Sequence, residues 1–465
     1  MNYPLMSTAR STPSESGAAP VAGQRHRRPE EFSVIAIEPI PVIVRTAIPS
    51  LRNNFAWTLG GNVLYGGCQW GMLSALAKLG NPSIVGLFTL GLAICAPVFM
   101  LTNLQLRAVQ ATDVNAECAF AEYFTLRLMA TLMGLTAIVF LLPFSANSAA
   151  GGMVILLVAV SKSIECMSDV TAGLLQREDQ LKRVAISLIL RGVGSVLVFS
   201  LTFAYFRNLA LSVASMSAVW LAVLLLYDVP NTRALIGAHE AFFHFDRRRL
   251  WRVAMLGLPL GWVATFSSLY VNIPRYFLQH CMGLADQGIY GSLAYLVVAI
   301  NLVIAALSVS VTTRLARLYA DGDLRQFLRL LGRLSALGIS ITAVGVPLTF
   351  TVGRPLLTFL YGRVYAEHVD LLALFVGIAG LSAVGSFLFC GLTAARIFRA
   401  QAAVYFAAML AGLAGSAFLV PRFGLLGAGY ALLASTVTVF IGGVWVMRKT
   451  LSGRLTVLFA ATSQG

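Results

Sequence analysis

Long apolar segments alternate with short polar segments along most of the chain. An apolar run of about 20 residues crosses the roughly 30 Å hydrocarbon core of a bilayer when it is helical, at 1.5 Å per residue. The pattern therefore predicts twelve membrane-spanning helices, numbered here as spans one to twelve. They are expected at residues 55–79, 82–106, 123–144, 151–175, 184–206, 209–226, 253–278, 287–313, 331–352, 371–393, 401–420 and 424–447.

Composition agrees with this pattern. Of the 465 residues, 58% are hydrophobic and 11% are charged, and the mean hydropathy is +0.80. Water-soluble domains of this length are far more polar, whereas integral membrane proteins have such values. The predicted fold class is an all-α polytopic membrane protein.

The polar N-terminal stretch differs from everything after it. It contains STPSESGAAP and GQRHRRPEE, and the apolar run that follows is broken by Glu38, Pro39 and Pro41. A cleaved signal needs an unbroken apolar core behind a short basic start, so we expect a disordered cytoplasmic arm over residues 1–53 instead.

Two segments in different halves of the chain have similar patterns. KLGNPSIVGLFTLGLAI joins spans one and two, and CMGLADQGIYGSLAYLV joins spans seven and eight. Each has glycines at matching places on both sides of a polar turn, which indicates a duplicated six-helix unit. The expected organisation is an N-lobe, a basic cytoplasmic connection, a C-lobe and a cytoplasmic tail, over residues 54–228, 229–252, 253–447 and 448–465.

Basic residues predict the orientation in the membrane. An even number of spans places both termini on one side, and most of the 34 Lys and Arg residues lie in the arm, the connections on that side and the tail. The positive-inside rule makes that side cytoplasmic. The opposite loops hold only Lys78, Arg207, Arg354, Arg363 and Arg422.

Three possible sites are better explained by other roles. The net charge of +15 is largely topological, and the run 247–249 suits lipid headgroups better than nucleic acid. DGD at 321–323 resembles a metal-binding D-x-D, but its place between two spans predicts a turn or helix cap. No metal site or disulfide is expected from the six cysteines, which are Cys68, Cys95, Cys118, Cys166, Cys281 and Cys390.

Span seven contains a polar stripe. Ser268, Asn272, Arg275 and Gln279 are spaced i, i+4, i+7 and i+11, on one helical face. Pro274 removes a backbone donor and frees carbonyl groups at that level. Two interpretations stay open: the guanidinium faces a cavity and binds phosphate, or it snorkels to the outer headgroups. The stripe favours the cavity.

Spans three to five hold further charges. Lys162, Glu165 and Asp169 share one face of span four, while Arg191 of span five and Arg127 of span three lie at similar depths. An ionised side chain in hydrocarbon costs roughly 2.5 to 3.5 kcal/mol on insertion scales, so these groups should face the protein interior. Either they form an ion-pair network that fixes packing, or the carboxylates couple transport to an ion. The cations outnumber the anions, which favours an anionic ligand.

Other polar residues extend the predicted pathway. Asn62, Tyr65 and Gln69 form a stripe in span one, Arg107 lies at the cytoplasmic mouth of span two, and Asn301 lies in span eight. They are expected to line the cavity, although interhelical hydrogen bonds are an equal explanation for Asn301.

Five ordered segments carry a family resemblance: FAWTLGGNVLYGGCQWGMLSALAKLG, NLQLRAVQATD, NIPRYFL, TTRLARLYADGD and GLTAARIFRAQ. They resemble the lipopolysaccharide and polysaccharide biosynthesis flippases of the multidrug, oligosaccharidyl-lipid and polysaccharide (MOP) exporter superfamily, over about residues 50 to 450. The resemblance implies twelve or fourteen helices in two six-helix lobes around a central cavity. It also implies that the protein moves a polyprenyl-pyrophosphate-linked glycan across the bacterial inner membrane by alternating access.

The resemblance further implies a basic cavity that holds the pyrophosphate. Arg275 and Lys162 are expected to fill this role, with Arg127, Arg191 and Arg107 as lesser candidates. The expected partners are the lipid-linked glycan, membrane lipids and other polysaccharide-assembly membrane proteins.

No cofactor is expected, because the chain has no G-x-x-x-x-G-K-[ST] phosphate loop. The membrane potential or an ion gradient would then supply the energy. Two alternatives are a multidrug or cation antiporter of the same fold, which would expose unpaired acids, and a membrane glycosyltransferase or polymerase. The second would need catalytic groups in a large outer loop, whereas the predicted outer loops are short and contain few acids.

Overall fold

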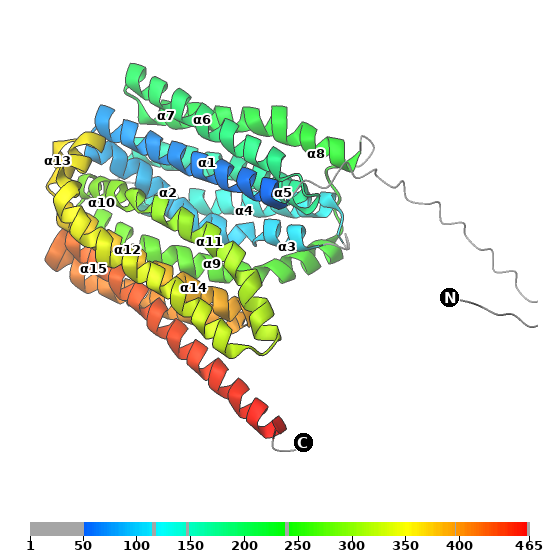
Figure 1. Ribbon diagram of the computed structural model, residues 1–465. Coiled ribbons are helices and arrows are strands. Elements are labelled where there is room, and N and C mark those ends of the chain that lie inside the picture. The colour runs from blue at the N-terminus through cyan, green and yellow to red at the C-terminus, as the bar shows by residue number, and fades with distance from the viewer. Residues whose placement is uncertain (1–50, 114–117, 146–147, 238–240, 396, 463–465) are drawn as a thin grey trace, which may run out of the picture. The chain divides into compact units, whose positions relative to one another are not determined.

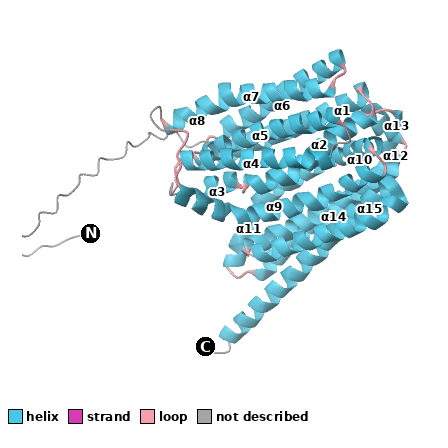
Figure 2. Cartoon of the chain, turned by 180° about the vertical axis from the view of Figure 1, so that it is seen from behind, coloured by secondary structure: helices cyan, strands magenta, loops and turns pink. Residues whose placement is uncertain are grey.

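The computed structural model describes residues 51–462 except 114–117, 146–147, 238–240 and 396. In this part of the chain the regular structure is entirely helical (Figure 2). Residues 1–50 of the predicted arm lie outside the described residues. The last three residues of that arm, 51–53, belong to α1, which begins at Leu51.

The first half of the chain contains eight α-helices and one π-helical turn. Their bounds are α1 Leu51–Leu79, α2 Pro82–Asn103, α3 Leu106–Thr112, α4 Phe120–Ser145, α5 Ala149–Arg177, α6 Leu181–Phe206, α7 Leu209–Val223, η1 Leu224–Asp228 and α8 Val229–Ile236.

The second half contains the remaining α-helices. Their bounds are α9 Arg247–Cys281, α10 Leu284–Leu296, α11 Val298–Ala320, α12 Leu324–Leu360, α13 Arg363–Ala366, α14 Val369–Ala394 and α15 Phe398–Thr462 (Figure 1). The expected connection therefore contains α8 and the first residues of α9, and the tail as far as Thr462 continues α15.

All twelve predicted spans lie on these helices, although α2 ends at Asn103, three residues before the predicted end of span two. Span eight is divided between α10 and α11, and spans eleven and twelve are both within α15, where Gly424 has non-helical angles of φ 53° and ψ −125°. By length and composition alone, nine helices in the described part are long and apolar enough to cross a membrane. Twelve spans become nine for two reasons. Spans eleven and twelve count once because both lie in α15, and span one (α1) and span eight (α10 and α11) are not among the nine.

Side chains at several helix starts satisfy free backbone donors, as N-caps do. Asn81 accepts a hydrogen bond from the Ile84 N–H at the start of α2. At α12, Asp323 accepts from the Gln326 N–H at 2.9 Å, and Gly322 has φ 76°. The sequence DGD is therefore a turn and a helix cap, as predicted.

The two halves meet mainly through α2, which packs on α9 and α10 of the second half. The crossing of α2 and α10 is close because it is made at glycines. A Cβ on Gly86 would overlap the carbonyl oxygen of Leu284, and a Cβ on Gly288 would overlap that of Pro82. Gly86 and Gly288 occupy equivalent places in the two similar segments, so those segments contact each other reciprocally.

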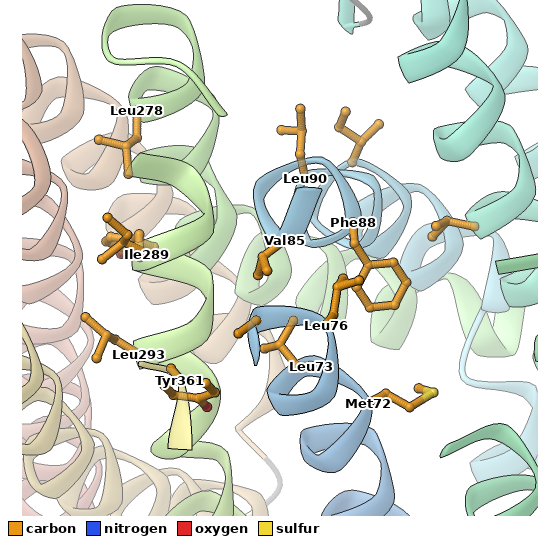
Figure 3. Close-up of a cluster of buried hydrophobic side chains, with 14 of the residues drawn as sticks. Met72, Leu73, Leu76, Val85, Phe88, Leu90, Leu278, Ile289, Leu293 and Tyr361 are labelled. Carbon is orange, nitrogen blue, oxygen red and sulfur yellow. The ribbon is translucent and has the colours of Figure 1, made fainter. Parts of the chain in front are cut away.

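The main apolar core also contains residues of both halves. Its buried side chains come from α1, α2 and α4–α7 on one side and from α9, α10 and α12–α15 on the other. Figure 3 shows Leu73 of α1, Val85 of α2 and Ile289 of α10 in this cluster. This core and the glycine crossing place α1, α5 and α10 around the polar site described next.

Candidate functional site

A cavity of about 270 Å³ lies among α1, α2, α5, α7 and the junction of α10 and α11. Asn62, Tyr65, Gln69, Lys162 and Glu165, all predicted from the sequence, line it. The apolar and aromatic residues that line the cavity were not predicted from the sequence, because only the arrangement of the helices brings them to the site. The remaining lining residues are Gly66, Phe88, Leu92, Val158, Ser161, Met216, Trp220, Tyr295 and Val298.

Lys162 and Glu165 form an ion pair in this cavity. Lys162 Nζ lies 2.7 Å from Glu165 Oε2, and the Tyr65 hydroxyl donates to Glu165 Oε1 at 3.1 Å. The side chains of Lys162 and Glu165 are 30% and 29% exposed, so the pair opens to the cavity. Lys162 Nζ also lies 5.9 Å from the Trp220 ring centre, within cation–π range.

Arg191 lies behind Tyr65. Its guanidinium carbon is 5.9 Å from the centre of the Tyr65 ring, and the residue is buried. Among the described residues Arg191 has no ion pair within 4.0 Å, although it interacts electrostatically with buried Asp228 of η1. Asp228 was not predictable as a counter-charge from the sequence, because it lies just beyond the predicted end of span six.

A second group of charges is built on Asp169. Arg127 Nη2 lies 3.0 Å from Asp169 Oδ2, and Arg107 Nη1 lies 3.3 Å from Oδ1. Arg127 also donates to the Asn103 carbonyl oxygen at 3.0 Å, and Arg107 to the Gln176 side chain at 3.1 Å. This group joins α2, α3, α4 and α5.

The Asp169 group holds two of the predicted phosphate-binding candidates, Arg127 and Arg107, in ion pairs. Arg127 has a fully buried side chain and is neutralised by Asp169, so it supports the fold and is not placed to bind a ligand. Arg107 is partly exposed, but it points to the same carboxylate. Asp169 therefore forms ion pairs with Arg127 and Arg107, and not with Arg191.

Arg275 lies apart from both groups. It is 9% exposed, and its guanidinium carbon is 6.0 Å from the ring centre of Tyr290 on α10. In the described part of the chain it has no ion-pair partner and its Nε has no hydrogen-bond partner. Burial against α10 argues against an arginine that snorkels to the headgroups. Arg275 is not among the residues that line the 270 Å³ cavity either.

The rest of the polar stripe of span seven is satisfied locally or left outside the cavity. The Asn272 amide donates to the Ser268 carbonyl oxygen at 2.9 Å. Gln279 is half-buried and Asn301 of α11 is exposed, and none of these side chains lines the cavity. The predicted single site is thus divided into a cavity group, an Asp169 group and the surroundings of Arg275.

A search against protein-family models found no match. One curated relative is the capsular polysaccharide biosynthesis protein CapF of Staphylococcus aureus. It is 25% identical over 402 residues, which are 85% of this chain and 99% of CapF.

Solved structures reveal the fold. An inward-facing multidrug resistance MATE family transporter of the MOP superfamily superposes with a TM-score of 0.60 at 13% identity, over 86% of this chain and 95% of the transporter. The chain has the fold of the MOP superfamily. The lipid II flippase MurJ in an inward closed conformation has a TM-score of 0.67 at 10% identity, over 84% of this chain and 86% of MurJ. CapF and these folds together confirm the resemblance to the polysaccharide biosynthesis members of the superfamily.

Proposed function

We propose that the chain is a flippase for a polyprenyl-pyrophosphate-linked oligosaccharide, such as a repeat unit of O-antigen, capsule or exopolysaccharide. It would carry this lipid from the cytoplasmic to the periplasmic leaflet of a bacterial inner membrane, with both termini in the cytoplasm. The similarity to CapF and the MurJ-like fold support this class of substrate, and the distribution of Lys and Arg supports the orientation.

The observation that carries the proposal is the charge balance of the cavity. Among its lining residues Lys162 is the single cation and Glu165 the single anion, and Arg191, whose counter-charge Asp228 lies outside the cavity lining, is directly behind Tyr65. The Gln69 side-chain nitrogen is buried and has no hydrogen-bond partner among the described residues. A phosphate oxygen that replaces Glu165 at Lys162 would accept a charge-assisted hydrogen bond beside this free amide.

Cavity size indicates which part of the substrate fits. Pockets for drug-sized ligands range from about 300 to 1,000 Å³, so a cavity of about 270 Å³ suits a pyrophosphate and not a whole oligosaccharide. The glycan therefore needs a wider state of the same pathway. In this mechanism the polyprenyl tail stays in the lipid while the charged headgroup moves between the halves.

Arg275 supplies the second cation in this mechanism. Its neighbour Tyr290 and the cavity-lining Tyr295 both belong to α10, so a movement of α10 changes the surroundings of both sites. Arg275 then becomes accessible as the halves reorient, and it binds the diphosphate bidentately.

One end of the interface between the halves is closed by hydrogen bonds. The Trp70 indole N–H of α1 donates to the Tyr361 hydroxyl at 2.9 Å, and that hydroxyl donates to the Ser292 carbonyl oxygen of α10 at 3.1 Å. In the proposed orientation this end faces the periplasm. These contacts would break when the pathway opens outward, as alternating access requires.

The proposed energy source is the membrane potential or an ion gradient, without ATP. An inside-negative potential drives an anion outward by about 2.3 kcal/mol per charge per 100 mV, and by about twice that for a diphosphate with two charges. Other polysaccharide-assembly membrane proteins are the proposed partners that supply and consume the lipid.

A leaflet assay tests the proposal. A null strain would be complemented with Lys162→Ala, Arg275→Ala or Arg275→Lys, and lipid-linked repeat units would be counted on each leaflet. Both alanine variants should insert normally and export poorly, while Arg275→Lys should retain part of the export. Lys182→Ala is the matched control, because Lys182 is an exposed lysine outside the cavity. Full export by both alanine variants would exclude the proposed role of the two cations.

A cation antiporter is the second candidate, because the MATE fold is similar and Glu165 lies in the cavity. That carboxylate already binds Lys162 and Tyr65, so a cation would have to displace both. Uptake of a labelled cationic dye into inverted vesicles separates the candidates. Dye transport that Glu165→Gln abolishes, together with normal glycan export in the null strain, would favour the antiporter.

A further inference from the structure

A second hollow lies outside the transport cavity, between α4 of the first half and α9 of the second. Its volume is about 1,000 Å³, and both ribbon views place α9 beside α3 and α4 (Figures 1 and 2). We call it the α4–α9 groove. Its lining residues are Leu104, Leu126, Met129, Ala130, Met133, Phe245, Arg247, Arg248, Leu250, Trp251, Ala254, Met255 and Leu258.

The α4–α9 groove is apolar along its length and basic at one end. Arg247 and Arg248 begin α9 and have no ion-pair partner among the described residues. The adjacent Arg249, in contrast, binds Glu122 at 3.0 Å and Asp246 at 3.5 Å. Glu122 and Asp246 are therefore occupied by Arg249, and Arg247 and Arg248, which have no ion pair in the described part of the chain, remain available to an anion at the mouth of an apolar channel.

The depth of the groove matches one leaflet of a bilayer. Along α9 it runs from Arg247 to Leu258, which is about 17 Å at 1.5 Å per residue. Half of the hydrocarbon core is about 15 Å thick. Trp251 is 64% exposed beside the arginines, as expected for an aromatic residue at the membrane interface.

We propose that the α4–α9 groove binds one resident anionic phospholipid. Arg247 and Arg248 bind its phosphate, and an acyl chain lies along Met129, Ala130 and Ala254. Because the lipid contacts both α4 and α9, it bridges the two halves of the protein.

The position of the groove favours a resident lipid over the transported one. Near α2 the groove is lined only by Leu104, the residue directly after the end of that helix, whereas Phe88 and Leu92 of α2 line the transport cavity. Leu92 and Leu104 are about 18 Å apart along the chain axis at 1.5 Å per residue. A headgroup at the two arginines is therefore outside the cavity that contains Lys162. This inference does not depend on which lipid the protein transports.

Lipid titration of the full-length chain in detergent, followed by native mass spectrometry, tests the proposal. The probes are phosphatidylglycerol and phosphatidylcholine with identical acyl chains. The wild type should retain phosphatidylglycerol preferentially. R247A/R248A should bind it about 30-fold more weakly, since each interfacial arginine contributes roughly a factor of five, and R247K/R248K should bind it nearly as well as the wild type.

Two further variants distinguish a built site from general surface charge. Ala254→Phe leaves the arginines in place and fills the groove, so it should also weaken phosphatidylglycerol retention. R325A/R329A is the matched control, because it removes two exposed arginines near the start of α12 that line no part of the groove. An equal loss in the control, or unchanged binding in Ala254→Phe, would overturn the proposal.

Competition with a polyprenyl pyrophosphate tests the occupant. The resident-lipid proposal expects no displacement of phosphatidylglycerol from the wild type at equal concentration. Displacement that R247A/R248A and Ala254→Phe both abolish would assign the groove to the transported lipid and overturn the proposal. Each variant should be monodisperse with a wild-type unfolding temperature, so that weaker binding is not a consequence of misfolding.

Discussion

The two halves of the molecule differ in the partners of the cations inside their predicted spans and at the span ends. In the first half Lys162 binds Glu165, and Arg127 and Arg107 share Asp169. In the second half Arg275 is 9% exposed and has a tyrosine ring but no carboxylate beside it in the described part. An unpaired buried charge costs far more free energy than a paired one. The first half thus pairs Lys162, Arg127 and Arg107 directly and has Asp228 as a more distant counter-charge for Arg191, whereas Arg275 in the second half has no carboxylate partner among the described residues.

In the proposed mechanism, this difference separates structural cations from ligand-binding ones. Arg127 is fully buried and paired, so it stabilises the packing of α2, α4 and α5. Lys162 is paired but faces a cavity, so a ligand can replace its carboxylate. Arg275 has no ion-pair partner among the described residues and is covered, so in the proposed mechanism a ligand can reach its guanidinium only after α10 moves. The variants below test this ranking.

Asp169→Ala should have the largest effect on stability. It leaves Arg127 buried with one carbonyl partner, and breaking a buried pair on one side costs about 3 to 5 kcal/mol. Unfolding of the purified protein in detergent should show this loss. Glu178→Ala is the control, because Glu178 forms a more exposed pair with Arg177 and should cost less than about 1 kcal/mol. Equal losses would mean that the Asp169 group is not structural.

Gly86→Ala tests the reciprocal crossing of α2 and α10, where Gly86 and Gly288 occupy equivalent places in the two similar segments. The added Cβ would meet the Leu284 backbone, and overpacking of this kind costs about 1 to 3 kcal/mol. Gly288→Ala should cost a similar amount, because its Cβ meets the equivalent Pro82 carbonyl group. Gly60→Ala should be neutral or slightly stabilising, since a Cβ there has nothing within 4 Å. A large difference between Gly86→Ala and Gly288→Ala would show that the reciprocal contact is not energetically symmetric.

Arg275→Met should increase stability and decrease transport. Removal of an uncompensated buried charge should stabilise the resting fold by about 1 to 2 kcal/mol, while export falls. Thermal unfolding and the leaflet assay would be measured on the same preparation. A destabilised Arg275→Met protein would indicate that the guanidinium has a stabilising partner, and the contrast between the halves would fail.

Glu165→Gln should increase anion binding by the first half. The amide removes the negative charge that competes for Lys162, so pyrophosphate should bind about tenfold more tightly, which corresponds to about 1.4 kcal/mol. Calorimetry with inorganic pyrophosphate measures the change. Glu367→Gln, which alters a carboxylate outside the cavity, should leave binding unchanged. Weaker binding in Glu165→Gln would show that Glu165 organises the site and does not compete for it.

The helices were largely predictable from the sequence, because each span carries its own apolar pattern. All twelve predicted spans lie on helices, and the DGD turn is formed as expected. For the site, the sequence predicted which residues take part but not most of the contacts between them. Lys162 and Glu165 lie one helical turn apart on α5, so their pairing follows from local spacing. The pairing of Asp169 with Arg127 and Arg107 joins three helices, and no local pattern encodes it.

The sequence by itself determined that this is a polytopic membrane protein, where its apolar segments lie, and which charges fall inside them. These properties follow from the transfer free energy of each side chain, which depends on its own chemistry. Only the tertiary structure decided which cations are neutralised and which face a cavity, and that the groove between α4 and α9 ends at Arg247 and Arg248. Such properties depend on how helices from distant parts of the chain rotate and pack against one another, so they belong to pairs of segments and not to any single one.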